Sequence, residues 1–291
     1  MLARWPGTGT MLRNRFGMVV LAVSLWATAA CFGGAGALAA GLSDKKPHDG
    51  VAKAHKMPVQ GIDVSYFQGD IDWKKVGRAG IQFAYIKATE GTDRVDPKYR
   101  DNWKGARKAG IVRGAYHVMY WCSPASEQAA WFEKNVPNDE GVLPPVLDVE
   151  WNGHSKTCPH EISRKAALAK IKVMLAAMEA HTGKRPIIYT DPKFHRDVLV
   201  GSFTDYQFWL RSTAAKPEAK YRGRDWSFWQ FTTTGRVPGV TGAVDRNIYN
   251  GTMADWTRAV KRMQAQNTAT EAVTEAATGA ATDAVATSVS Q

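Results

Sequence analysis

The chain has 291 residues, of which 44% are apolar, 22% are charged and 10% are aromatic, and its formal net charge is +11. This composition is globular and excludes a collagen-like, a coiled-coil or a wholly disordered protein. The positive charge suits an anionic partner such as a cell-wall polymer, a membrane surface or a nucleic acid. Because the basic residues are scattered rather than clustered into a run, we expect no nucleic-acid partner.

The first 39 residues have the composition of a secretory signal peptide. Three arginines and no acid precede an apolar run over residues 18–32, and the small residues around Ala39 fit a cleavage site. The run is shorter than the ~20 apolar residues that a membrane-spanning helix needs. We therefore expect cleavage after Ala39, no stable membrane anchor, and a secreted or periplasmic protein.

Two further segments lack the apolar residues of a core. Residues 40–57 are polar and are predicted to be a linker, and residues 264–291 are mainly Ala, Thr and Val without an aromatic side chain. The second segment is predicted to be a disordered tail. Residues 58–263 remain as one predicted domain, near the lower size limit of ~200 residues for an eight-stranded α/β barrel.

Short apolar runs alternate with amphipathic segments along this domain. The runs, each predicted to be a strand, are residues 60–64, 83–87, 112–119, 146–149, 186–190, 208–211, 228–231 and 243–248. The helical patterns cover residues 73–79, 97–109, 125–134, 161–182 and 192–200. Such alternation predicts a parallel sheet that is buried on both faces. The fold class is therefore α/β, as an incomplete TIM-like β/α barrel with eight strands and about five helices.

The polar residues at the strand ends are the candidates for chemistry, because a barrel of this kind carries its site at that rim. They are Asp63, Glu90, His117, Asp148, Glu150, Asp191, Arg211, Gln230 and Asp245. Asp148 and Glu150 are two apart on one strand and face the same side. Neighbouring carboxylates disfavour joint ionisation, and one protonated and one charged group is what glycosidic bond cleavage needs. A pair of salt-bridged or solvated loop acids fits the motif equally well.

The cysteines and histidines say less about the function than the acids do. Cys122 and Cys158 are the two cysteines left after the predicted cleavage, and in an exported protein we expect them to form a disulfide that stabilises by ~3 kcal/mol. Metal-ligand spacings and nucleotide-binding motifs are absent from the mature sequence, so no metal and no cofactor is expected. His117 fits either a core histidine or a substrate contact. Trp151 follows Glu150 directly and is the best candidate for stacking on a sugar.

A series of short motifs runs in one order through residues 58–256. They are Gly61-Ile62-Asp63-Val64-Ser65, Gln68-Gly69, Tyr85-Ile86-Lys87-Ala88-Thr89-Glu90-Gly91, Gly114-Ala115-Tyr116-His117, Leu147-Asp148-Val149-Glu150, Ile188-Tyr189-Thr190, Trp229-Gln230-Phe231-Thr232 and Val244-Asp245-Arg246-Asn247. In sequence and order they resemble family 25 glycoside hydrolases, the Chalaropsis-type lysozymes.

The resemblance implies an N-acetylmuramidase that hydrolyses the β-1,4 bond between N-acetylmuramic acid and N-acetylglucosamine in bacterial peptidoglycan. It also implies a barrel of eight strands and five helices. Glu150 matches the general acid, Asp148 the second carboxylate, and Asp63 and Asp245 the two acids contributed by the first and last strands. The predicted glycan contacts are Tyr85, Glu90, Tyr116, His117, Trp151, Tyr189, Trp209 and Gln230.

Two positions depart from the family pattern. Arg94 stands where an aromatic residue or Leu is usual, and Arg211 stands where a small residue is often found, so the shape of the cleft differs. The leading prediction is a monomeric, exported, retaining muramidase in which the substrate's own 2-acetamido oxygen attacks the anomeric carbon. A non-catalytic cell-wall glycan-binding module and a chitin-directed glycosidase are the two alternatives.

Overall fold

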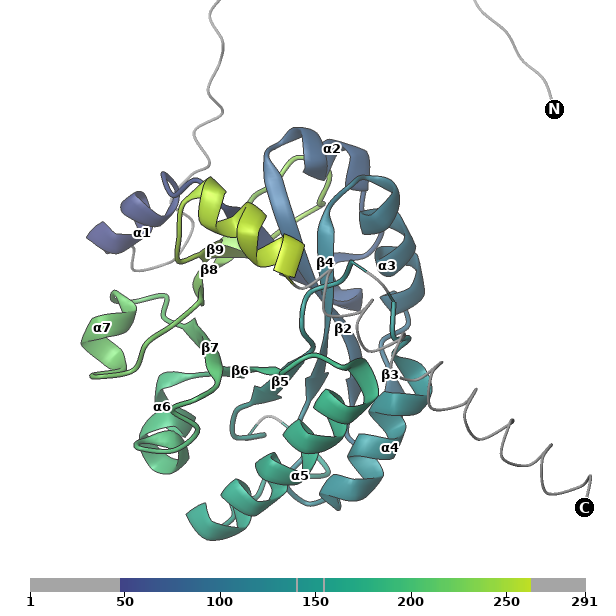
Figure 1. Ribbon diagram of the computed structural model, residues 1–291, viewed down its shortest axis with the longest axis vertical. Coiled ribbons are helices and arrows are strands. Elements are labelled where there is room, and N and C mark those ends of the chain that lie inside the picture. The colour runs from purple at the N-terminus through teal and green to yellow at the C-terminus, as the bar shows by residue number, and fades with distance from the viewer. Residues whose placement is uncertain (1–47, 140, 154, 263–291) are drawn as a thin grey trace, which may run out of the picture. The chain divides into compact units, whose positions relative to one another are not determined.

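A computed structural model describes residues 48–139, 141–153 and 155–262, and its centre is a closed β-barrel. The strand order is β1-β9-β8-β7-β6-β5-β4-β2-β3, and a further pairing of β1 with β2 closes the ring, with the helices around its outside (Figure 1). The two-residue strand β3 lies beside β2 and outside the ring. The predicted α/β barrel of eight strands is confirmed. Within the described residues, no helix is long and apolar enough to cross a membrane.

All predicted strands form, but one runs in the opposite direction to the rest. They are β1 (Gln60–Val64), β2 (Ile81–Glu90), β4 (Val112–Val118), β5 (Val146–Val149), β6 (Ile187–Thr190), β7 (Gln207–Arg211), β8 (Phe228–Gly235) and β9 (Val244–Tyr249), with β3 at Arg94–Val95. The ring is parallel from β1 through β2 to β8, whereas β9 pairs antiparallel with both β8 and β1. The prediction of a parallel sheet is wrong for β9, because the connection over residues 236–243 is too short for the crossover of a dozen or more residues that a parallel return needs.

The described residues hold about eight helices rather than the five predicted. These are α1 (Asp49–Ala54), α2 (Trp73–Arg78), α3 (Tyr99–Lys108), α4 (Ala125–Asn135), α5 (Arg164–Thr182), α6 (Pro192–Phe194) with its continuation His195–Leu199, α7 (Pro217–Lys220) and residues 253–262. The five predicted segments correspond to α2 through α6. The sequence does not predict α1, α7 or the helix at residues 253–262. Helix α7 has four residues, which is too few to show a helical period, and α1 lies in the segment predicted to be a linker.

Helix α1 lies inside the segment that the sequence predicts as a linker. Val51 and Ala54 are fully buried and cluster with Trp229, Phe231 and Ile248 of β8 and β9. The packed part of the chain therefore begins before residue 58. The predicted signal peptide (residues 1–39) and tail (residues 264–291) lie outside the described residues.

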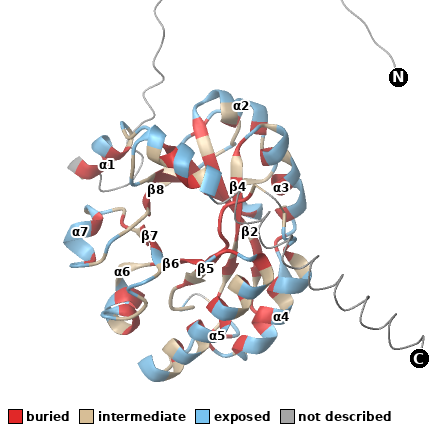
Figure 2. Cartoon of the chain, viewed as in Figure 1, coloured by how far each residue is buried: buried red, intermediate tan, exposed pale blue. Residues whose placement is uncertain are grey.

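The barrel interior is filled by aromatic rings from strands that are not neighbours in the sheet. Tyr85 of β2 stacks on Trp209 of β7 with centroids 4.9 Å apart, and Phe83 of β2 meets Phe228 of β8 at 5.2 Å. A Cβ atom on Gly61 would lie 2.3 Å from the Phe83 ring, so β1 needs glycine there. Figure 2 shows buried residues along the strands and the inner helix faces. Aromatic side chains thus fill the barrel interior, so a ligand can bind only at the end of the barrel.

Candidate active site

The four predicted acids meet at one rim of the barrel. Asp63 lies near the end of β1, Asp148 lies on β5, and Glu150 follows β5 directly. Asp245 stands at the start of β9, and because β9 is antiparallel, its start lies where the parallel strands end. Asp63 and Asp245 are direct partners in the β1–β9 register.

Two side-chain amides hold Asp63. Gln230 Nε2 donates to Asp63 Oδ2 at 2.9 Å and to Asp245 Oδ2 at 3.2 Å, and Asn247 Nδ2 donates to Asp63 Oδ2 at 2.7 Å. A second hydrogen bond, to the amide oxygen, fixes the orientation of each amide group. Trp209 Nε1, which is a donor only, binds Asn247 Oδ1 at 2.8 Å, and Tyr189 OH donates to Gln230 Oε1 at 2.9 Å. Both amides therefore present N–H groups to the carboxylates.

The Asp148 and Glu150 pair combines burial with charge repulsion. Burial, followed by the charge of Glu150, raises the pKa of Asp148 well above its usual range. Burial, followed by the charge of Asp191, raises the pKa of Glu150 to about 7, although Arg211 opposes the shift. The atoms Asp148 Oδ1 and Glu150 Oε1 are buried and form no hydrogen bond with a described residue. Glu150 can therefore keep a proton close to neutral pH.

Both carboxyl groups border a cavity of about 400 Å³. Tyr120, Trp151 and Asn152 line it together with residues 155–157. The backbone at Glu150 is held from outside, because Trp121 Nε1 donates to the Glu150 carbonyl at 2.6 Å. Glu150 thus has a fixed position beside a space large enough for a ligand.

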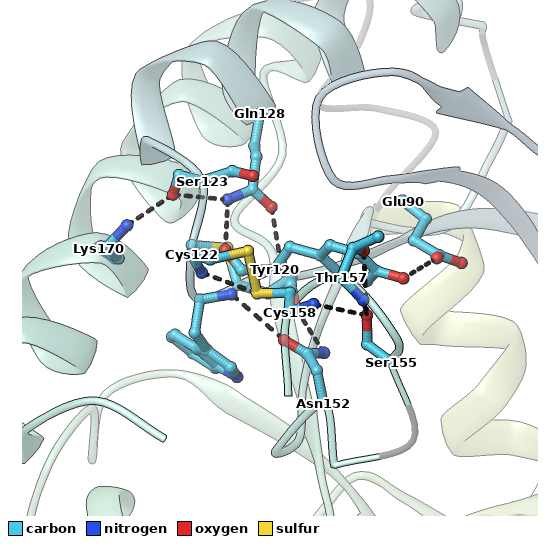
Figure 3. Close-up of a disulfide and its surroundings, with 12 residues drawn as sticks. Glu90, Tyr120, Cys122, Ser123, Gln128, Asn152, Ser155, Thr157, Cys158 and Lys170 are labelled. Atoms are coloured by element: carbon cyan, nitrogen blue, oxygen red, sulfur yellow. Dashed lines mark hydrogen bonds between the residues drawn. A yellow bond between two sulfur atoms is a disulfide. The ribbon is translucent and has the colours of Figure 1, made fainter. Parts of the chain in front are cut away.

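The predicted disulfide is confirmed, and it joins the loops after β4 and β5. Cys122 and Cys158 are bonded, with Cα atoms 5.7 Å apart. Asn152 links the same two loops, since its Nδ2 donates to the Met119 carbonyl at 3.0 Å and its Oδ1 accepts from the Trp121 amide at 3.2 Å (Figure 3). The bridge therefore pins the cavity wall that includes Ser155, whose Oγ accepts from the Cys158 amide at 3.0 Å.

Several of the residues predicted to contact the glycan are buried and contact other side chains. Tyr85, Trp209 and Gln230 are at most 2% exposed, and they belong to the barrel interior and the amide network. His117 is fully buried on the outer side of β4, where Thr89 Oγ1 lies 2.8 Å from Nδ1 and Gln128 Oε1 lies 3.3 Å from Nε2. Both ring nitrogens thus have partners inside the core, and the sugar contact expected for His117 stays a prediction.

Two of the other predicted contacts, Trp151 and Glu90, line the cavity. Trp151 Nε1 donates to Asp197, and the Trp151 ring packs edge-on against Phe194. Tyr116 is half-buried, and burial together with the charge of Asp63 raises its hydroxyl pKa well above the usual range.

Three functional residues were not singled out from the sequence. Lys87 and Asn247 lie in quoted motifs two residues after Tyr85 and Asp245, so the two-residue strand period places them on the same inward face. Tyr120 donates to Glu90 from a loop, and no pattern points to it. Across the described ranges, no three His, Cys, Asp or Glu side chains are placed to hold one metal ion.

The family model described as glycosyl hydrolases family 25 matches residues 62–240. The chain therefore belongs to this family and is a glycoside hydrolase. Lysozyme M1 of Streptomyces globisporus is 38% identical over 213 residues, which are 70% of this chain and 72% of that protein. The uncharacterized protein YegX of Escherichia coli strain K12 is 38% identical over 203 residues, 68% of this chain and 71% of its own. The crystal structure of the lysozyme from Streptomyces coelicolor superposes with a TM-score of 0.65 at 36% identity and covers 72% of this chain and 99% of that chain.

Proposed function

We propose that this glycoside hydrolase is an exported lysozyme that hydrolyses the β-1,4 bond between N-acetylmuramic acid and N-acetylglucosamine in peptidoglycan. The observation that carries the proposal is the buried Asp148 and Glu150 pair, with raised pKa values, at the edge of a cavity. Relatives named Lysozyme M1 and N,O-diacetylmuramidase share the family and support the choice of substrate.

Glu150 is proposed as the general acid. A carboxyl group with a pKa of about 7 retains its proton under neutral conditions and gives it to the glycosidic oxygen as the bond breaks. Asp63 and Asp245 are held by Gln230 and Asn247 on the other side of the rim, and we propose that they position the sugar.

The attacking group is proposed to come from the substrate. Asp148 and Glu150 rise from the same strand end, so Asp148 is badly placed to reach the sugar face opposite Glu150. The carbonyl oxygen of the 2-acetamido group attacks the anomeric carbon instead, and the glycosidic oxygen leaves with the Glu150 proton. Asp148 orients the amide, and the positive charge of the cyclised ion favours the ionised form of this carboxyl. Water then opens the ring, gives its proton to Glu150, and restores the β configuration.

The bond that is cut is tested with purified protein and whole peptidoglycan. Mass spectrometry of the released muropeptides should find N-acetylmuramic acid at the reducing ends, and the Glu150→Gln protein serves as the control. Reducing-end N-acetylglucosamine would contradict the muramidase assignment. A protein that releases nothing but sediments with peptidoglycan would be a binding module, and comparable cleavage of chitin oligomers would indicate a chitin-directed enzyme.

The attack mechanism has its own test. Proton NMR of the first product should show the β anomer, and a thiazoline mimic of the cyclised amide should inhibit. An α anomer would overturn both the retaining assignment and the substrate-assisted route. Export is tested by N-terminal sequencing of protein recovered outside the cytoplasm, which should begin at Ala40.

A further inference from the structure

Two cations share the cavity that holds the acid pair. Arg94 and Lys156 both line the space of about 400 Å³ that also exposes Asp148 and Glu150. The Arg94 side chain is 61% exposed, and Lys156 is exposed as well. A second cavity of about 590 Å³ also includes Arg94, so this side chain stands where the two spaces adjoin.

The positive charge of these two groups is not cancelled by the neighbouring acid. Glu90 lies close to Arg94, with 3.4 Å between Arg94 Nη1 and Glu90 Oε1. The same carboxylate already has a shorter ion pair with the largely buried Lys87 and accepts a hydrogen bond from Tyr120. The Glu90 charge is therefore balanced by Lys87, and four of the five Arg94 N–H donors have no acceptor among the described residues. Lys156 forms no ion pair with any described residue.

The Asp148 and Glu150 pair repels an anionic ligand less than two ionised carboxylates would. Asp148 and Glu150 both have raised pKa values, so near neutral pH they carry less than two negative charges together. An anionic group of the ligand beside Arg94 and Lys156 would thus meet a net positive end of the cavity. The chain's formal charge of +11 acts in the same direction at longer range.

The backbone beneath both cations is fixed. Arg94 pairs with Glu90 in the β2–β3 ladder, and its carbonyl accepts from Trp131 Nε1 at 3.0 Å. Lys156 lies inside the loop that the Cys122–Cys158 bridge closes. Both charges therefore project from anchored positions, which reduces the ordering cost when a ligand binds.

We propose that Arg94 and Lys156 form an anion subsite, which binds a carboxylate carried by the muramic acid substituent of the glycan. This inference rests on the proposed muramidase function and adds a determinant of specificity to it. The carboxylate is either that of the 3-O-lactyl group or that of a peptide attached to it. An arginine fork suits this ligand, because guanidinium and carboxylate form paired hydrogen bonds.

The test compares three muramyl oligosaccharides of equal length. One carries the free lactyl carboxylate, one carries the peptide, and one has the lactyl group converted to a neutral methylamide. For the protein with both native cations, kcat/KM for the better anionic substrate should exceed that for the neutral one by about fivefold, the size of one exposed ion pair. Whichever anionic substrate is better identifies the source of the carboxylate. Added salt should reduce the ratio.

Variants that lack the charges then test whether Arg94 and Lys156 cause this preference. The Arg94→Gln/Lys156→Gln protein should cleave the anionic and neutral substrates with a ratio near one. Arg94→Lys alone should keep only part of the preference, because the charge remains but the paired hydrogen bonds are lost. The matched control, Lys104→Gln/Arg107→Gln, removes two exposed charges from α3 outside this cavity and should keep the full ratio. A ratio that persists in the first variant, or a native protein without a preference, would overturn the subsite. Failure to cleave any of the three substrates would instead contradict the muramidase function.

Discussion

Replacement of Glu150 by glutamine is expected to stabilise the fold at alkaline pH while it removes activity. The folded protein raises the pKa of this carboxyl from 4.5 to about 7. A raised carboxyl pKa means that the folded state binds the proton more tightly than the unfolded state, so stability is complete below pH 4.5 and is lost as the pH rises toward 7. At 1.36 kcal/mol per pKa unit, the loss above pH 7 is about 3 kcal/mol.

Glutamine has no proton to lose, so the variant avoids this cost. The difference in unfolding free energy between Glu150→Gln and the native protein should therefore be up to about 3 kcal/mol larger at pH 8.5 than at pH 4. Activity should fall by ~10²–10⁴-fold, because the general acid is gone. The stability gain would show that the native protein gives up stability for catalysis at this position.

Urea unfolding followed by tryptophan fluorescence measures the difference at both pH values. Glu133→Gln, an exposed change on α4, is the control and should show little change between the two pH values. If the stability difference for Glu150→Gln were the same at pH 4 and pH 8.5, burial would not be raising the carboxyl pKa. Near-normal turnover by the variant would refute its role as the proton donor.

Three further results are expected from other parts of the molecule. Activity should decline as the pH rises through about 7, and Arg211→Gln should move that decline to higher pH, because the Arg211 charge lowers the pKa of the proton donor; an unmoved pH profile would contradict this. The Cys122→Ser/Cys158→Ser protein should lose about 3–4 kcal/mol in urea unfolding, since the bridge spans 36 residues; equal stability would show that the bridge adds nothing. Gly61→Ala should cost about 1–3 kcal/mol through overlap with the Phe83 ring, and an unchanged unfolding midpoint would contradict the close packing.

The apolar runs were sufficient to locate all eight barrel strands, because both faces of these strands are buried. The direction of each strand is harder to predict from the sequence. The sequence predicts Asp245 at a strand end, but it stands at a strand start and reaches the same rim because β9 runs antiparallel. Only the length of the preceding connection carries that information, and the apolar pattern of β9 is the same in either direction.

The candidate acids could be found from the sequence, whereas the groups that hold them could not. A two-residue period places Gln230 and Asn247 on the inward face, but it does not say that Tyr189 and Trp209 orient their amides. His117 follows a tyrosine on the same strand and faces outward, so only the strand register separates a substrate contact from a core residue.

The ring closes through residues that are far apart in the chain. Asp63 receives its hydrogen bonds from Gln230 and Asn247, which follow it by 167 and 184 residues. A nascent chain that ends at β7 already contains Asp148 and Glu150 but lacks both amides and β9, the strand that pairs with β1 on the side away from β2. Pairings of such long range form late and slowly. We therefore expect the complete set of four acids to assemble only when synthesis of the domain is nearly finished, so that a chain still being made has no complete site.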